Sequence, residues 1–258
     1  MIKLKVLSLF SSALLIASCA QTEQTEYVLT DSLLRTMQAG DSKTFAVLNA
    51  DSPADKLESY SEILDSKSTF LPNADSATIF KESYTRTGNL IYPFTSRLFQ
   101  QDDEGNVILL GVTRSGEEYW IVDENHNAGE IFLPNDLSTF SEAISISSAL
   151  KRCENQICEL QGQLDISIEP AGTETIETNF GKFETYKVSI EWDLSLFDSD
   201  NATNSFSQLL RKEASKQWIH PALGVVKFIY QVQTDSQIAT LLGNLTQTNI
   251  SIPERYKK

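Results

Sequence analysis

Residues 186–194 carry the pattern that most constrains this fold, because apolar and polar side chains alternate there without a break. The apolar positions are Tyr186, Val188, Ile190, Trp192 and Leu194, and the positions between them are lysine, serine, glutamate and aspartate. Successive side chains of a β-strand point to opposite faces of the sheet, so this segment has one apolar and one polar face. The pattern predicts a half-buried strand with Trp192 on the core face and Glu191 in solvent.

Similar signals recur along the chain and predict a mainly β protein. Residues 164–168 and 226–232 repeat the two-residue period, and residues 106–113 and 118–123 flank a turn-like Arg-Ser-Gly-Glu. A second turn is expected at residues 102–106, where Asp-Asp-Glu-Gly-Asn interrupts the apolar pattern. Strands joined by such short turns form antiparallel hairpins.

Helical spacing is confined to a few stretches. Residues 27–37 and residues 238–245 place leucines at helical intervals, and residues 139–149 fit either a short helix or a strand. We therefore expect a curved antiparallel sheet or an incomplete β-barrel with one to three short helices.

Two cysteines inside the chain are close enough to pair. Cys153 and Cys158 flank a turn-like Glu-Asn-Gln-Ile, and nearby cysteines in an oxidising compartment read as a disulfide. A metal site or a redox pair is the alternative, although zinc takes three or four ligands and redox pairs favour Cys-x-x-Cys. A disulfide here closes a very short loop, so its contribution to stability is modest.

The first 19 residues read as an export signal. Two lysines precede an apolar run from Val6 to Ala17, and Ile-Ala-Ser-Cys follows with Cys19 as its last residue. The apolar run is too short to span a bilayer. The pattern resembles the lipobox of bacterial lipoproteins. That resemblance implies a signal peptide at residues 1–18 and a Cys19 carrying diacylglycerol and a further acyl chain such as palmitate.

This resemblance also implies localisation in the bacterial cell envelope. The residue after the lipidated cysteine acts as a sorting signal in such proteins, and Ala20 is not the aspartate that retains them at the inner membrane. The outer membrane is favoured, with the body facing the periplasm. The alternative is an ordinary cleaved signal peptide in which Cys19 is incidental. If the lipobox is used, residues 19–26 are the lipidated cysteine and a polar tether. Residues 27–258 are expected to form a single β-rich domain.

The charge of the chain excludes one class of partner. The formal net charge is −14, and removal of the signal takes away Lys3 and Lys5 without any acid, which leaves −16 on 258 − 18 = 240 residues. Nucleic-acid binding depends on basic patches, so an anionic body of this kind is not expected to bind nucleic acid. Acyl chains hold a protein on a membrane without a basic patch when two or more are present.

Two later segments carry a second resemblance. Residues 179–188 read Asn-Phe-Gly-Lys-Phe-Glu-Thr-Tyr-Lys-Val, and residues 217–227 read Gln-Trp-Ile-His-Pro-Ala-Leu-Gly-Val-Val-Lys. In that order they resemble a group of uncharacterised bacterial periplasmic proteins and lipoproteins. The resemblance covers mainly residues 150–250. It implies a curved antiparallel sheet like that of the periplasmic lipoprotein carriers.

Both segments also have a simple structural interpretation. Gly181 suits a turn that needs positive φ, and Pro221 with Gly224 suits a turn between two strands. Trp192 and Trp218 are expected in the concave core. Together with Phe228 and Tyr230 they are the candidate pocket or core aromatics. The alternative is that Trp218, His220 and Lys227 line the mouth of a pocket.

Nothing in the sequence predicts catalysis. The two histidines are His126, in a polar hairpin tip, and His220, and the chain lacks the motifs of hydrolases, nucleotide-binding loops and zinc proteases. We expect no enzyme, no cofactor and no metal. The expected role is that of an envelope scaffold or protein-binding component. The alternative is a carrier of an apolar ligand in the concave face of the sheet, since such sites are hollow and mostly apolar.

Overall fold

The computed structural model describes residues 24–50, 58–70, 76–86, 96–114, 117–122, 128–154, 157–197, 208–233 and 238–258. The strands are β1 Glu26–Tyr27, β2 Ser42–Asn49, β3 Glu58–Phe70, β4 Ser76–Arg86, β5 Ser96–Gln101, β6 Val107–Arg114, β7 Glu117–Ile121, β8 Glu130–Leu133, β9 Ile144–Glu154, β10 Ile157–Glu177, β11 Lys182–Phe197, β12 Gln208–His220, β13 Gly224–Gln233 and β14 Ile238–Thr248. The mainly β character expected from the sequence is confirmed.

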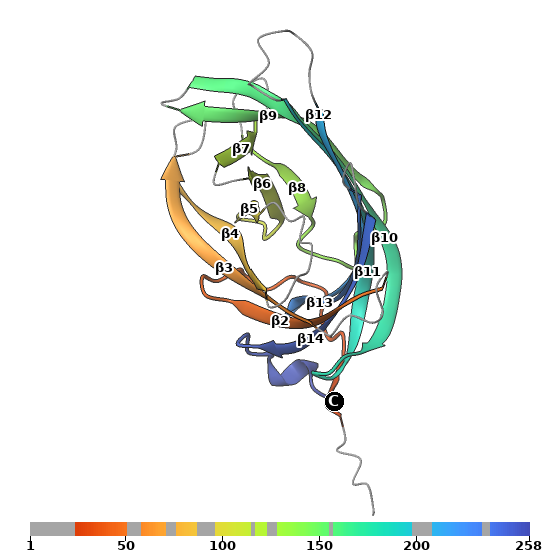
Figure 1. Ribbon diagram of the computed structural model, residues 1–258. Coiled ribbons are helices and arrows are strands. Elements are labelled where there is room, and N and C mark those ends of the chain that lie inside the picture. Colours follow the sequence, from red (N-terminus) through yellow and green to blue (C-terminus); the bar gives the residue numbers. More distant parts are fainter. Residues whose placement is uncertain are drawn as a thin grey trace, which may run out of the picture.

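The strands form a closed ring (Figure 1). Within the described residues, twelve antiparallel strands follow one another in the order β11-β10-β9-β7-β6-β5-β4-β3-β2-β14-β13-β12, and β12 pairs back onto β11. The short β1 adds to β11 in parallel, and β8 pairs with β6. The sheet is therefore a complete barrel, and the expected incomplete barrel is corrected on this point. Closure removes the free edges that an open sheet would expose.

The pairing is much longer on one side of the ring than on the other. β10 and β11 pair from Gly162 with Leu196 to Glu177 with Lys182, interrupted by one bulge after Pro170. In contrast, β4 meets β5 only at Phe80–Phe99 and Lys81–Leu98, and the seam between β7 and β9 is equally short. Strands β5 to β8 therefore form a small sheet that completes the ring through two narrow seams.

The expected helices are not present in the described part of the chain, where the one helical element is the 3-10 turn η1, Glu254–Tyr256. Residues 27–37 begin in β1 and continue without regular secondary structure apart from one bridge at Leu33. Residues 238–245 belong to β14, and β9 begins at Ile144. In β14, Leu241, Gly243 and Leu245 are buried on one face. Gly243 lies under the Phe228 ring, so a glycine occupies the middle position of the apolar face and hides the strand period from the sequence.

The turns follow the sequence more closely. Gly105 has φ +87° in the β5–β6 turn, and Gly224 has φ +73° where β13 begins after Pro221. Gly181 is needed for a different reason from the one expected. It does not have a positive φ, but a Cβ there would lie 2.7 Å from the Tyr27 ring and 2.9 Å from the Thr25 carbonyl oxygen. The glycine allows β1 to approach the β10–β11 hairpin.

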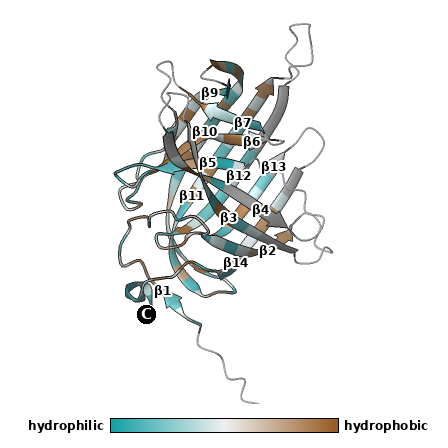
Figure 2. Cartoon of the chain, turned by 90° about the vertical axis from the view of Figure 1, so that its left-hand side faces the viewer, coloured by the Kyte–Doolittle hydropathy of each residue, from teal (hydrophilic) through white to brown (hydrophobic). Residues whose placement is uncertain are grey.

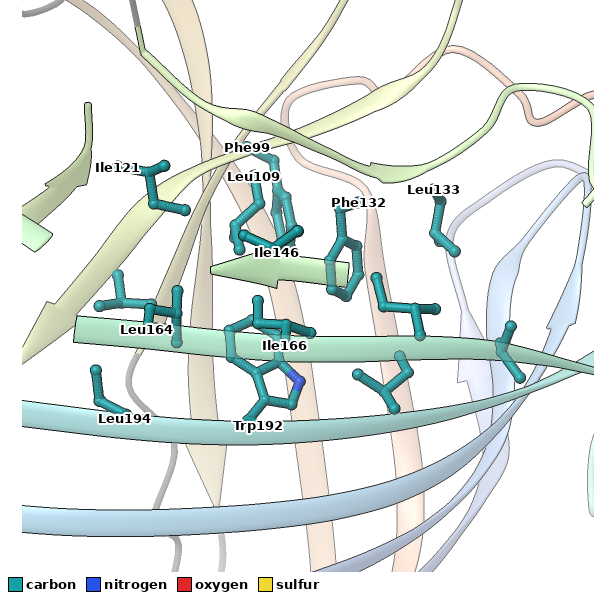
Figure 3. Close-up of a cluster of buried hydrophobic side chains, with 14 of the residues drawn as sticks. Phe99, Leu109, Ile121, Phe132, Leu133, Ile146, Leu164, Ile166, Trp192 and Leu194 are labelled. Atoms are coloured by element: carbon teal, nitrogen blue, oxygen red, sulfur yellow. The ribbon is translucent and has the colours of Figure 1, made fainter. Parts of the chain in front are cut away.

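The largest core cluster fills the barrel between β10–β11 and β5–β8 (Figure 3). Figure 2 shows apolar and polar residues interspersed along the strands, as expected for strands with one face inside and one outside. A second cluster gathers at the end of the barrel where the N-terminal strand and η1 meet. It includes Tyr27, Phe45, Phe183, Trp218 and Leu223.

Candidate functional site

Trp192 lies at the centre of the filled part of the barrel (Figure 3). Its ring centroid is 5.7 Å from that of Phe132, and the guanidinium carbon of Arg97 lies 4.7 Å from the indole centroid. The β10–β11–β12 register sets Ile166, Trp192 and Glu213 side by side. The alternation over residues 186–194 thus places Trp192 inside the barrel, while Glu191 on the opposite face is exposed.

A line of buried polar groups runs beside Trp192. Arg97 and Glu213 are both buried, and their side chains approach to 3.9 Å between Nη2 and Oε2. Farther along β12, Gln217 donates from Nε2 to the Tyr230 hydroxyl at 2.9 Å. Burying a charge is costly unless it is paired, so the ion pair and the cation over the indole ring account for the position of Arg97 inside the barrel.

A cavity of about 170 Å³ lies beside these polar groups. Most of its lining is apolar, with Met37, Phe99, Phe132, Ile219 and Phe228 among the residues. Its polar members are Arg35, Asp41, Lys43, Glu62, Arg97, Gln217 and Tyr230. Sites for drug-sized ligands are larger, roughly 300–1,000 Å³. Trp218, His220 and Lys227 all lie in the described part of the chain, and none of them lines this cavity. The alternative that these three residues line the mouth of a pocket is therefore not supported.

The segment 28–41, which we call the strap, covers the cavity at one end of the barrel. It is held by backbone donors that reach four separate parts of the molecule: Leu34 N to Asn135 O at 2.8 Å, Arg35 N to Pro221 O at 3.1 Å, Met37 N to Gln101 Oε1 at 2.9 Å and Gly40 N to Leu64 O at 2.8 Å. Leu34 and Met37 themselves line the cavity. The strap therefore closes this end of the barrel.

His220 is sealed at the same end. Its ring stands edge-on to Phe183 at 5.7 Å and to Tyr256 at 5.0 Å between centroids, and it has no exposed surface. Its Nδ1 accepts a hydrogen bond from Ala222 N at 3.3 Å, as a neutral imidazole would. Burial lowers the pKa of His220 from 6.5 to about 4. His220 is therefore neutral near pH 7 and shielded from any solute.

Trp218 is buried as well, but on the other face of the sheet from Trp192. It pairs with Lys187 on one side and Lys227 on the other, and their ammonium nitrogens lie 5.2 and 4.7 Å from its ring centroid. Its Nε1 donates to Glu174 Oε2 at 3.0 Å. That hydrogen bond, and then the one from Lys187, hold the pKa of Glu174 below its ordinary value. Trp218 is thus part of a buried core cluster, as expected, but it lies on the outer face of the sheet and not on the concave one.

Of the other predicted positions, most lie in the part of the chain that the structure describes and two do not. Cys153 and Cys158 form a disulfide, with Cα atoms 4.0 Å apart at the end of the β9–β10 hairpin. Phe228 and Tyr230 lie on β13, with ring centroids 4.6 Å apart, beside the cavity. Cys19 and His126 lie outside the described residues. Gln24 and Thr25, expected in the tether, already bond to the β10–β11 hairpin.

Sequence reasoning missed Arg97, Glu213 and the strap. Arg97 and its neighbours Leu98 and Phe99 are all buried, so their strand offers no alternation to reveal the inner face. The strap contacts segments that lie up to 256 − 28 = 228 positions away, since Val28 N donates to Tyr256 O. Such long-range contacts leave no mark in the local sequence pattern. No group of three or more metal-ligating side chains occurs in the part of the chain that the structure describes.

Among the described residues there is no helix with the length and apolar character needed to cross a membrane.

No family model matches the sequence, and no curated protein matches it significantly. Three solved structures are similar in part. An exported protein with a YmcC-like fold from Bacteroides fragilis NCTC 9343 is 15% identical at a TM-score of 0.34, over 84% of this chain and 99% of that one. A lipoprotein from Parabacteroides distasonis ATCC 8503 is 13% identical at a TM-score of 0.36, over 85% of this chain and 99% of that one. The hypothetical lipoprotein YmcC from Escherichia coli K12 is 9% identical at a TM-score of 0.28, over 83% of this chain and 92% of that one.

Proposed function

We propose that this chain is a lipid-anchored, non-catalytic component of the bacterial cell envelope, which acts as a scaffold or binds another envelope protein. The observation that carries the proposal is the filled interior of the barrel. Phe99, Phe132 and Trp192 occupy the space between the two walls, and the strap covers the cavity beside Phe228. An exported barrel of this kind presents its outer surface and its loops to partners.

The anchor part of the proposal rests on the lipobox that ends at Cys19. Attachment of acyl chains stabilises membrane binding by ~0.8 kcal/mol for each buried methylene, so two or three chains hold a protein firmly. We propose the outer membrane as the site, with the barrel in the periplasm, because Ala20 follows the cysteine. The Cys19→Ser variant should appear in the soluble periplasmic fraction once its signal peptide has been removed. A processed variant that still sediments with membranes would contradict the anchor.

The non-catalytic part rests on the sealing of His220. A general base must come within hydrogen-bond reach of the proton that it removes. The His220 ring is enclosed by Phe183, Tyr256 and the backbone of Ala222, so it serves the packing of this end of the barrel. The buried carboxylate of Glu213 is likewise engaged by Arg97.

The alternative of an apolar-ligand carrier predicts a ligand in the cavity beside Phe228. A cavity of about 170 Å³ compares with the 150 Å³ engineered cavity that holds benzene, and a lipid needs several times more room. Native mass spectrometry of the Cys19→Ser protein, purified from periplasm without detergent, tests this directly. We expect the mass of the bare polypeptide with its disulfide. A retained lipid that survives gentle activation would favour the carrier instead.

A further inference from the structure

The two ends of the described chain meet at one end of the barrel. We call this end the anchor end and define it as residues 24–28, 177–184 and 254–258. Val28 N donates to Tyr256 O at 2.7 Å, and Lys258 N donates to Glu26 O at 3.0 Å. In both ribbon views this end lies opposite the upper part of β9, with its disulfide-bonded hairpin (Figures 1 and 2). The chain that leads back to Cys19 leaves from here.

The distance from the anchor end to Cys19 is limited by the length of the chain. Gln24 is held by its Nε2 on Thr178 O at 2.6 Å, and Thr25 O accepts from Lys182 N at 3.0 Å. Gln24 lies five positions after Cys19, and an extended chain covers at most ~18 Å over that length. β11 alone has 16 residues and is roughly 50 Å long. An acylated Cys19 therefore keeps the anchor end near the lipid surface and leaves the far end out of its reach.

The charges of the anchor end differ from those of the rest of the protein. Its cations are Lys182, Arg255, Lys257 and Lys258, whose side chains are 43%, 64%, 38% and 71% exposed. Each already pairs with a carboxylate, Lys182 and Lys258 with Glu26, Arg255 with Asp31 and Lys257 with Glu254, so contact with a lipid phosphate would exchange one anionic partner for another. The carboxylates at or beside it are Glu26, Asp31, Glu177, Glu184 and Glu254. Four cations and five carboxylates give −1, so −15 of the −16 on the processed chain lies elsewhere. Anionic lipid surfaces repel such flanks and tolerate the near-neutral end.

We infer that the anchor end is a membrane-contacting surface, on which Lys182, Arg255, Lys257 and Lys258 meet the phosphodiester groups of phospholipid headgroups. The barrel then stands with its disulfide-bonded hairpin pointing away from the bilayer. Lysine and arginine carry a charged head on a long apolar stem, which suits contact with the headgroup layer. The sequence does not reveal this surface because Lys182 lies more than 70 positions before the C-terminal cations. The inference rests on the proposed acylation of Cys19.

Fluorescence quenching on vesicles tests the orientation. The lipidated protein is reconstituted into vesicles of phosphatidylethanolamine and phosphatidylglycerol that contain a lipid with a headgroup nitroxide. Single cysteines for a fluorophore are introduced as Asn179→Cys at the anchor end and Glu159→Cys in the disulfide-bonded hairpin, both exposed positions. We expect strong quenching at position 179 and at least fivefold less at position 159. Equal or reversed quenching on vesicle-bound protein would overturn the inference.

A pair of charge variants tests the role of the cations. Lys257→Glu with Lys258→Glu should reduce the quenching at position 179 at least twofold, because the end then repels phosphatidylglycerol. The matched control is Lys216→Glu, which introduces the same kind of charge at an exposed position of β12, and it should leave the quenching unchanged. An unaltered signal in the double variant would contradict the contact with headgroups. Failure of the parent protein to float with the vesicles would instead overturn the proposed acylation, and the orientation with it.

Discussion

Trp192 and Trp218 come from adjacent strands and each lies under a cationic side chain, yet they belong to opposite faces of the barrel. Trp192 packs against side chains of the interior, such as Phe132 and Arg97. Trp218 faces outward and is covered by Lys187 and Lys227, with a hydrogen bond to Glu174. The two tryptophans are buried to a similar extent, but Trp192 is stabilised by packing inside the barrel and Trp218 by charged and polar side chains on its outer face.

The difference shows that a barrel of this size buries residues in two ways. Inside, strands from opposite walls share one apolar cluster, so a side chain there contributes through packing against distant parts of the chain. Outside, at the anchor end, the termini and the long β10–β11 hairpin cover the sheet and bring charged groups with them. Substitutions should therefore act through lost packing at Trp192 and through lost polar contacts around Trp218.

The largest effect is expected for Trp192→Ala. Truncation of a buried aromatic side chain costs ~3–5 kcal/mol, and Trp192 contacts both the β10–β11 wall and the small β5–β8 sheet. Denaturant unfolding of the mature, unlipidated protein gives the change in the free energy of unfolding. A loss below about 1 kcal/mol would mean that the interior collapses onto the vacancy and that the packing distinction from the outer face is wrong.

His220 provides a pH test of the cluster at the anchor end. Its pKa of about 4 in the folded protein lies below the ordinary 6.5, so between these values the unfolded chain binds more protons than the folded one. The stabilisation from a neutral His220 is fully present above pH 6.5 and is lost progressively as the pH falls from 6.5 to about 4. The linkage gives a loss of about 2 kcal/mol at pH 5 relative to pH 7.5.

The control for this prediction is His220→Phe, which keeps an aromatic ring between Phe183 and Tyr256 and cannot titrate. The difference in stability between the parent and this variant should vary with pH by the amount above, since the carboxylates titrate in both proteins. A difference that stays constant between pH 7.5 and pH 5 would show that His220 is already solvated in the folded state.

Glu174 tests the polar support of Trp218. Glu174→Ala leaves the Trp218 Nε1 without its acceptor and removes the partner of Lys187. We expect a loss of about 1–2 kcal/mol, most of it from the unsatisfied indole N–H. Glu174→Gln keeps an acceptor oxygen and loses only the exposed ion pair, which is worth about 0.2–1 kcal/mol. If both variants lose the same amount, the ion pair and not the hydrogen bond supports Trp218.

The two tryptophans also mark the limit of what the sequence predicts. The face of Trp192 follows from five alternating residues, because solvent lies on the other side of that part of β11. Around Trp218, Gln217, Ile219 and His220 are buried too, since the anchor end covers the outer face, and the alternation disappears. Closure of the ring depends on β11 meeting β12 and on two short seams at β5 and β7. Such pairings depend on register between distant strands, which local periodicity does not specify.

The smallest effect is expected for Glu191→Ala, the neighbour of Trp192 on the outer face. Glu191 is exposed, and its row in the register contains Ser167 and Ala214, which offer it no opposite charge. Exposed substitutions of this kind change stability by less than about 0.5 kcal/mol. Glu191→Ala and Trp192→Ala are measured in the same denaturant series. Because the two residues are neighbours on one strand, the difference between their free energies of unfolding reports which face of the sheet is buried. If Glu191→Ala were the more damaging variant, the assignment of faces along β11 would be inverted, and the indole of Trp192 would become a candidate for contact with a partner.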